Sequence, residues 1–342
     1  MIKITQNSKI FVYCPAGVVT GGAELLHQLV HELNVNNIEA YIYYFDRPSA
    51  EVEVPADYKA YNLRVATRIV QASENVIVLY EAIFDRIKEV GPCQLLLWWL
   101  SVDNFFICSR DYLSAFDYFG WDFKQGCKVL GKRLLKFALF KDYISLKALT
   151  NLDAVSCYQS EYAQHFLYSK GFREVLPLTD YINTSFSSRK EVIGRENKIL
   201  YNPKKGFEFT RKIMAAAPHI KWVPLQNMSR QQLIREFQTA KIYIDFGYHP
   251  GKDRIPREAA LNDCCIITNR RGSAGYFEDV SIYNKYKLSE ASGMASIVAV
   301  LNEVLENYEE CIKDFAFYKE RILREQADFV HQVKQIFIVT RS

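Results

Sequence analysis

The sequence begins with a short apolar run, a glycine-containing loop, an amphipathic segment and a second apolar run. Residues 10–14 read IFVYC and are followed by a proline, which is typical of a strand buried in a parallel sheet. Within 23–34, leucine and valine recur every three or four positions, which predicts a helix with one buried face. Residues 40–45, AYIYYF, form the next apolar run. This order predicts the start of a doubly wound α/β domain.

The same alternation continues and then starts again in the second half. An irregular, serine-containing stretch at 177–189 separates the two series, so we expect two domains, as suits 342 residues. The first covers residues 1–180 and the second 190–342, with the last helix able to pack back on the first domain. The predicted strands are 10–14, 40–45, 76–79, 95–98, 154–157, 174–176, 198–201, 220–223, 241–245 and 264–268. The predicted helices are 23–34, 81–90, 161–170, 207–217, 229–240, 257–262, 296–308 and much of 309–339.

Charge and cysteine usage argue against several classes of protein. A formal net charge of +4 does not by itself predict nucleic-acid binding. The eight cysteines form no CxxC pair and several lie in apolar runs, so we expect reduced core thiols and a cytosolic compartment. No apolar run approaches ~18 residues, so no membrane-spanning helix is expected. The N-terminal residues also lack the apolar stretch of a signal peptide.

Residues 124–147 form an unusually basic stretch, with seven lysine and arginine residues against one acidic residue, Asp142. Apolar side chains are interleaved with the basic ones, and Trp121 and Phe123 precede them. One interpretation is a basic amphipathic helix or helix pair that attaches residues 121–147 to an anionic membrane surface, at about 1 kcal/mol per basic residue. The other is a packed helix whose basic face is solvated.

The loop before the first predicted helix carries Gly21 and Gly22. Glycines let a ligand approach the backbone closely, and a helix N-terminus favours phosphate, so these residues are candidates for phosphate binding. The alternative is a tight turn without a ligand. A dinucleotide-binding dehydrogenase would carry GxGxxG at this position, and that spacing is absent.

Polar residues gather where the strands of the second series end, which is where open α/β sheets bind ligands. A lysine after the strand 198–201 can neutralise a diphosphate. The stretch 245–258, DFGYHPGKDRIPRE, offers further cations and a glutamate that can accept hydrogen bonds from ribose. The stretch 270–275, RRGSAG, is a further possible anion cradle; solvated loops and ordinary turns are the alternatives. The candidate ligand-binding residues are Lys205, Gly206, Lys252, Arg254, Glu258 and Ser273.

Taken together, these motifs resemble those of GT-B glycosyltransferases, and most of all the pattern of glycosyltransferase family 4. Four segments carry the resemblance in order along the chain: GGAELLHQLVHEL at 21–33, VLPLTDYINTSF at 175–186, Lys205-Gly206, and REAALNDCCII at 257–267. The resemblance implies an α/β GT-B fold with two Rossmann-like domains facing each other across a cleft. It also implies a nucleotide-sugar donor on the C-terminal domain and an acceptor on the N-terminal domain.

The family motif can be placed residue by residue near position 258. Glu258 matches the second glutamate of the family's E-x7-E motif, which implies a contact with ribose. The first glutamate would fall at Pro250, and the family's arginine before the lysine would fall at Leu200. His249 and Asp253 are the candidate replacements for the missing glutamate.

In the first half, Asp103 is the candidate catalytic base if the enzyme inverts the sugar's configuration. It follows Trp98 and Trp99, whose rings could stack on a sugar; the alternative is a loop acid beside two core tryptophans.

The resemblance implies a glycosyltransferase that moves a sugar from a nucleotide-sugar donor to a saccharide or lipid-linked glycan. The implied setting is bacterial surface polysaccharide or lipopolysaccharide synthesis, in the cytoplasm or on the inner face of the cytoplasmic membrane. The donor is a substrate, and we expect no cofactor. We also expect no metal, because no DxD-like carboxylate pair follows a strand. The alternatives are a non-catalytic GT-B-like nucleotide- or glycan-binding protein and an NAD-dependent oxidoreductase.

Overall fold

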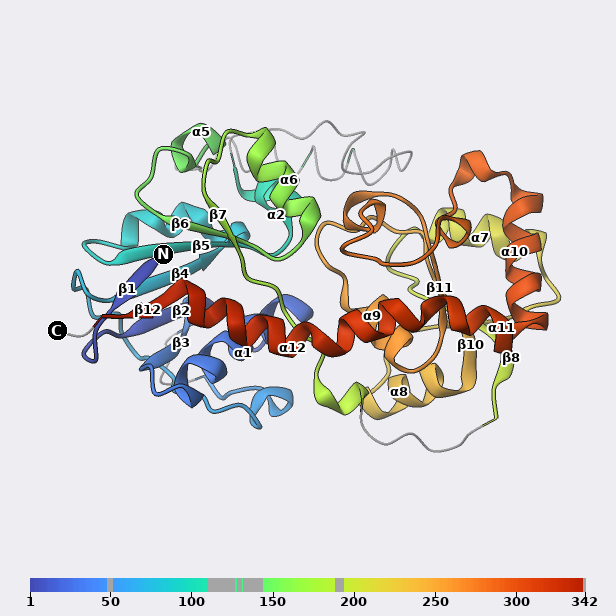
Figure 1. Ribbon diagram of the computed structural model, residues 1–342, viewed down its shortest axis with the longest axis horizontal. Coiled ribbons are helices and arrows are strands. Elements are labelled where there is room, and N and C mark those ends of the chain that lie inside the picture. Colours follow the sequence, from blue (N-terminus) through green and yellow to red (C-terminus); the bar gives the residue numbers. More distant parts are fainter. Residues whose placement is uncertain (48–51, 110–126, 128–130, 132–143, 188–193, 341–342) are drawn as a thin grey trace. The chain divides into compact units, whose positions relative to one another are not determined.

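The computed structural model describes residues 1–47, 52–109, 127, 131, 144–187 and 194–340. They form two compact units, shown in the colours of the sequence in Figure 1. Unit 1 contains Met1–Asp180 and the residues from Ala327 onward, and unit 2 is Tyr181–Gln326. The chain therefore passes from one unit to the other twice. Most of the basic stretch 121–147 lies outside the described residues.

Unit 1 is built on a six-stranded parallel sheet with the strand order β3-β2-β4-β5-β6-β7. Every residue of the central strand β2 is buried, as expected for a strand covered on both faces, whereas the edge strand β3 alternates between buried and half-buried residues. The order along the sheet reverses between β2 and β4. The strands are β2 (Ile10–Cys14), β3 (Ala40–Tyr44), β4 (Val76–Tyr80), β5 (Gln94–Trp99), β6 (Val155–Tyr158) and β7 (Val175–Pro177).

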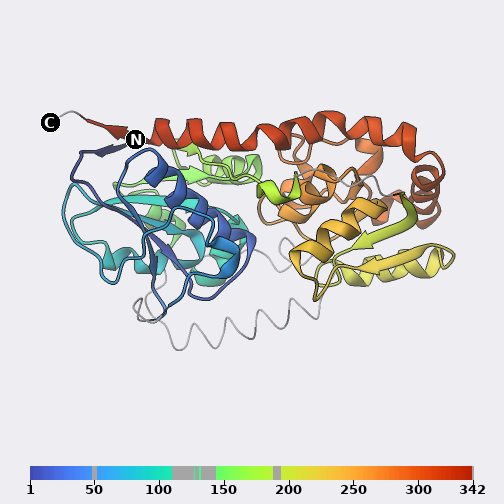
Figure 2. The same ribbon diagram turned by 90° about the horizontal axis from the view of Figure 1, so that it is seen from below.

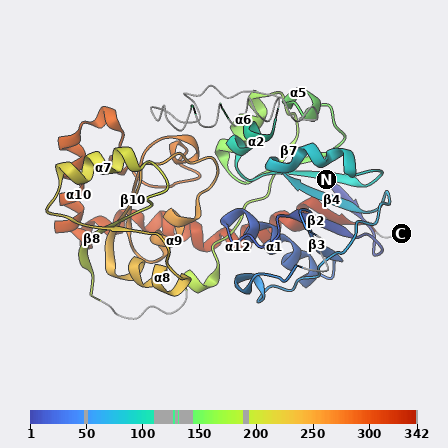
Figure 3. The same ribbon diagram turned by 180° about the vertical axis from the view of Figure 1, so that it is seen from behind.

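Capping residues set the ends of the helices in unit 1. Helix α1 (Gly21–Val35) packs on β2 and β3 (Figure 3), and the Thr20 side chain caps its first turn. Helix α6 (Glu161–Ser169) ends before Gly171, as predicted. The helix predicted at 81–90 is instead the 3-10 helix η3 (Glu81–Glu89), because non-helical backbone angles at Ile83 interrupt it. The shorter helices are η2 (Ala56–Tyr58), α2 (Val102–Cys108) and α5 (Leu146–Leu149).

Unit 2 is built on a four-stranded parallel sheet with the order β11-β10-β8-β9. Its order reverses between β8 and β10, so the carboxyl ends of these two strands flank the point where open α/β sheets bind ligands. The fully buried side chains of Ile199, Ile242 and Ile266 belong to its core. The strands are β8 (Glu196–Tyr201), β9 (Lys221–Pro224), β10 (Ala240–Asp245) and β11 (Cys265–Thr268).

In unit 2, capping residues and a proline mark where two of the helices begin. Ser229 and Gln232 form a capping box at the start of α8, where the sequence predicted a cap. Helix α9 begins at Arg254, three residues earlier than predicted, and accommodates Pro256 in its first turn. The helices are α7 (Phe207–Ala216), α8 (Arg230–Thr239), α9 (Arg254–Leu261), α10 (Met294–Glu306) and α11 (Tyr308–Cys311). The 3-10 helices are η4 (Thr184–Phe186), η5 (Gly272–Gly275), η6 (Asn284–Tyr286), η7 (Glu290–Ser292) and η8 (Ile312–Phe315).

The last helix, α12 (Ala316–Ile336), carries the chain from unit 2 back to unit 1. Helix was predicted over much of 309–339; the last three residues of that range form β12 (Phe337–Val339), which pairs in parallel with β1 (Ile2–Ile4). In Figure 2, the blue strand β1 lies beside the red strand β12 that follows α12. Within unit 1, the fully buried Phe329 of α12 stacks on Trp98, with the ring centroids 6.5 Å apart.

Two further expectations can be compared with the described residues. The thiols of Cys14, Cys93, Cys127, Cys157, Cys264, Cys265 and Cys311 are free, and all of these except Cys127 are buried. The helices among the described residues include none with the length and apolarity needed to cross a membrane.

We predict that Phe329→Ala lowers the free energy of unfolding by about 3 to 5 kcal/mol, because it leaves a cavity beside Trp98. Leu323→Ala is the matched control, since Leu323 lies on the same helix and is 56% exposed. Denaturant unfolding of the full chain measures both variants. Equal stability of the two variants would show that this contact does not anchor the end of α12 in unit 1.

Candidate functional site

The loops that follow β8 and β10 meet at the carboxyl edge of the sheet in unit 2. The two strands end in register, with Tyr201 of β8 opposite Ile244 of β10. Gly206 lies at a φ of 59°, and a Cβ at this position would lie 2.5 Å from the main chain of Phe246. Only glycine allows the two loops to approach so closely.

The loop after β11 is fixed against the same place. Gly272 has a φ of 60°, and a Cβ there would lie 2.0 Å from the carbonyl oxygen of His249. The main-chain N–H of Ser273 donates to the carbonyl oxygen of His249 (2.9 Å). Its hydroxyl donates to the carbonyl oxygen of Gly251 (2.6 Å). The Ser273 hydroxyl therefore holds the loop after β10 in position.

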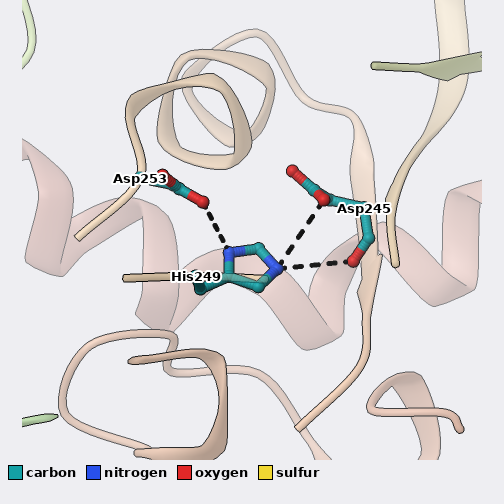
Figure 4. Close-up of side chains that lie close together, drawn as sticks. All are labelled: Asp245, His249 and Asp253. Atoms are coloured by element: carbon teal, nitrogen blue, oxygen red, sulfur yellow. Dashed lines mark hydrogen bonds and ion pairs between the residues drawn. The ribbon is translucent and has the colours of Figure 1, made fainter. Parts of the chain in front are cut away.

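Three side chains from β10 and its loop converge in Figure 4. His249 is fully buried, and its Nδ1 lies 2.8 Å from Oδ2 of Asp253. Its Nε2 lies 3.4 Å from the carbonyl oxygen of Asp245 and 3.7 Å from Oδ1 of the same residue. Both ring nitrogens thus face oxygen atoms, and only the doubly protonated ring can donate from both. Burial lowers the pKa of His249, but the charges of Asp245 and Asp253 outweigh this effect and raise it above its ordinary value.

Lys205 adds a second cation to this cluster. Its Nζ lies 2.6 Å from Oδ2 of Asp253, the same oxygen that faces His249. Burial alone would raise the pKa of Asp253, but Lys205 and His249 hold it well below its ordinary value. The Lys205 side chain is 32% exposed, and an ammonium has three hydrogens to donate. Lys205 can therefore bind an anion while it keeps its bond to Asp253.

The same three side chains also offer a set of metal-ligating atoms. Oxygen and nitrogen atoms of Asp245, His249 and Asp253 lie within 4.8 Å of one another. In this structure, however, Asp245 accepts hydrogen bonds from the Gly247 N–H (2.9 Å) and the Tyr243 hydroxyl (3.0 Å). Asp253 is in turn paired with Lys205, so both carboxylates already have partners among the described residues.

The other predicted residues of unit 2 pair with carboxylates nearby. Lys252 Nζ lies 2.7 Å from Oε1 of Glu325, a residue of α12. Arg254 Nε lies 3.6 Å from Oε1 of Glu258, and both side chains are nearly buried. The structure therefore brings together Lys205, Gly206, His249, Asp253 and Ser273, and places Lys252 and Arg254 against Glu325 and Glu258.

The predicted residues of unit 1 lie at the carboxyl edge of its own sheet. Gly21 and Gly22 open α1 directly after the Thr20 cap. Asp103 lies in α2, is fully buried and accepts a hydrogen bond from the Tyr162 hydroxyl (2.9 Å). Trp98 and Trp99 have no exposed surface, which supports their interpretation as core residues.

Three acidic residues with defined partners were not singled out from the sequence. Asp245 is the last residue of the apolar strand β10, and its position at the carboxyl end of a strand could have identified it as a candidate site residue. Glu81 follows β4, accepts a hydrogen bond from the Leu100 N–H (2.9 Å) and is fully buried, which raises its pKa to about 7. Glu325 bonds to Arg257, 68 residues away, so no local pattern could have indicated it.

No model of a protein family matches the sequence, and a search of curated proteins found no match. Solved structures do match. Sucrose-phosphate synthase from Thermosynechococcus elongatus has a TM-score of 0.65 at 10% identity, over 96% of this chain and 98% of that one. Anabaena HepE in complex with UDP and glucose has a TM-score of 0.57 at 11% identity, over 96% of this chain and 98% of that one. The catalytic domain of Arabidopsis thaliana starch synthase IV bound to ADP and acarbose has a TM-score of 0.56 at 10% identity, over 96% of this chain and 98% of that one. The predicted fold is confirmed: this chain has the GT-B glycosyltransferase fold.

We predict that the stabilising effect of His249 depends on pH. Because folding raises its pKa, its ion pairs contribute fully below the unfolded pKa of ~6.5 and are lost as the pH rises through the folded value. The loss of unfolding free energy in His249→Gln should therefore be larger near pH ~6 than near pH ~9. Denaturant unfolding at both pH values measures it, with the exposed His331→Gln as control. A loss that does not change with pH would mean that His249 is neutral in the folded protein.

Proposed function

We propose that this chain is a glycosyltransferase that transfers a sugar from a nucleotide-sugar donor, and that unit 2 binds the donor's diphosphate at Lys205. The observation that carries the proposal is the position of this lysine. It lies after β8, beside the point where the strand order reverses, in a chain with the GT-B fold. Asp253 fixes its ammonium there.

The chemistry of sugar transfer explains why a fixed cation is useful at this edge. The departing nucleoside diphosphate gains negative charge as its bond to the sugar breaks, and a preorganised cation lowers the energy of that transition state. Lys205 supplies such a charge, and the N-terminus of the ten-residue helix α7 follows it directly. The closely packed loops after β10 and β11 keep the site rigid, so little reorganisation is needed when the charge develops.

The neighbouring residues are proposed to act in two ways. Asp253 acts by holding Lys205, and the buried His249, whose Nδ1 lies 2.8 Å from the same carboxylate oxygen, acts by positioning Asp253. Glu258, on α9, is proposed to accept hydrogen bonds from the ribose, as the family resemblance implies, with Arg254 beside it as a further cation. In unit 1, Gly21 and Gly22 remain candidates for phosphate binding at the start of α1, and Asp103 remains the candidate base if the enzyme inverts.

The acceptor and the cellular setting are proposed from the sequence alone. The acceptor would be a saccharide or lipid-linked glycan, and the reaction a step in bacterial surface polysaccharide synthesis. It would take place in the cytoplasm or at the inner face of the cytoplasmic membrane, where the basic stretch 121–147 would contact anionic lipid. The family resemblance and the charge of that stretch support this proposal.

A second candidate function is nucleotide or glycan binding without catalysis. Pro250 favours it, because proline replaces the first glutamate of the family motif and offers no side-chain acceptor for a sugar hydroxyl. Release of nucleoside diphosphate in the presence of acceptor separates the two functions, since a binding protein would hold the donor without turnover.

We predict that Lys205→Ala lowers the rate of donor turnover by about 100-fold, because the charge that stabilises the leaving group is removed. Lys204→Ala is the matched control, since Lys204 is the exposed neighbour of Lys205 in the same loop. Nucleoside diphosphate release measures the turnover, and thermal unfolding verifies that both variants fold. Wild-type turnover in a folded Lys205→Ala protein would exclude the proposed role.

We further predict that turnover does not need a divalent metal, because Asp253 is already paired with Lys205 and Asp245 accepts hydrogen bonds from Gly247 and Tyr243. Excess EDTA should leave the rate within about twofold of that with added Mg²⁺ or Mn²⁺. If EDTA abolishes turnover and metal restores it, the three side chains of Figure 4 become the ligand set instead.

A further inference from the structure

The loop that carries Asp253 is held by a second group of charged side chains, formed by Lys252, Arg257 and Glu325. Oε1 of Glu325 lies 2.7 Å from Lys252 Nζ, and Oε2 lies 2.7 Å from a terminal nitrogen of Arg257. Arg257 has no exposed surface, and Glu325 is 4% exposed. Each oxygen of one buried carboxylate therefore binds a different residue of the segment that follows β10.

Arg257 connects this carboxylate to the main chain of the loop. Its Nε donates to the carbonyl oxygen of Asp253 (3.1 Å). Its second terminal nitrogen donates to the carbonyl oxygen of Lys252 (2.9 Å). A guanidinium is planar and its donors have a fixed geometry, so the orientation that Glu325 gives it determines where both carbonyls lie. Asp253 is the residue whose carboxylate contacts Lys205 and His249. The contacts thus run from Glu325 through Arg257 and Asp253 to Lys205.

Glu325 also has a special place in the chain. It lies on α12 two residues before Ala327, where the chain enters unit 1. Four residues further along the same helix, Phe329 stacks on Trp98, and Gln332 accepts a hydrogen bond from the Thr179 N–H (2.7 Å). One continuous helix is therefore bonded to the segment after β10 in unit 2 and, within about two turns, to residues of unit 1.

We propose that Glu325 is a positioning residue that couples occupancy of the Lys205 site to the part of α12 that belongs to unit 1. The inference rests on the proposed function of the site. A diphosphate at Lys205 places new negative charge beside Asp253 and shifts the balance of the ion pairs there. Arg257 is bonded to the Asp253 carbonyl and to Glu325, so a shift of this loop displaces or strains a fully buried ion pair. Such pairs are costly to break, which makes Glu325 move with the loop.

Amide hydrogen exchange of the full chain with and without a nucleoside diphosphate tests the coupling. UDP, ADP and GDP are screened first, and the one that binds is used at saturation. In the wild type we expect it to slow exchange in residues 252–258 and in 327–336. In Glu325→Gln the slowing at 252–258 should persist, while the slowing at 327–336 falls by about fivefold or more. Glu325→Asp, which keeps the charge, should restore part of it.

Glu320→Gln is the control on the same helix, because Glu320 forms an ion pair of the surface kind with its exposed neighbour Arg324. If Glu325→Gln does not fold, Lys252→Gln removes one of the two bonds and is measured in the same way. A variant that lowers the melting temperature but keeps both slowed regions would show a purely structural role and overturn the inference. If the wild type binds none of the three nucleotides, the proposed function fails first, and the inference fails with it.

Discussion

The contact between Lys205 and Asp253 is the interaction on which the candidate site depends. It joins the loop after β8 to the loop after β10 through one carboxylate oxygen, which also faces His249. Charges in such a position are costly to bury unless they are paired, and removing one partner leaves the others uncompensated. The arrangement therefore fixes an ammonium group at the sheet edge and leaves part of it open to a ligand.

The strand order of unit 2 and two glycines bring Lys205 and Asp253 into contact. Because β8 and β10 are neighbours and their order reverses there, the loops that follow them begin side by side at the same edge of the sheet. Gly206 and Gly272 remove the side-chain atoms that would otherwise collide with the neighbouring main chain. Arg257 and Glu325 then hold the loop after β10 from the side of α12. The site is thus a product of main-chain packing as much as of its charged residues.

The sequence predicted those features that depend on local patterns. Buried strands, the Ser229 cap and the stop at Gly171 were readable because each is encoded within a few residues. Lys205, His249 and Asp253 could be selected by their position after strands, but their mutual bonds could not, since 48 residues separate Lys205 from Asp253. The pairing of β1 with β12 and the bond from Arg257 to Glu325 join distant segments, and neither leaves a local signature.

The most direct test of the central claim is a crystal structure of the full chain with the nucleoside diphosphate that it binds. The account predicts a phosphate oxygen within hydrogen-bond distance of Lys205 Nζ, at the start of α7, with Asp253 still in contact with the lysine. A nucleotide bound elsewhere, with this edge of the sheet unoccupied, would contradict it.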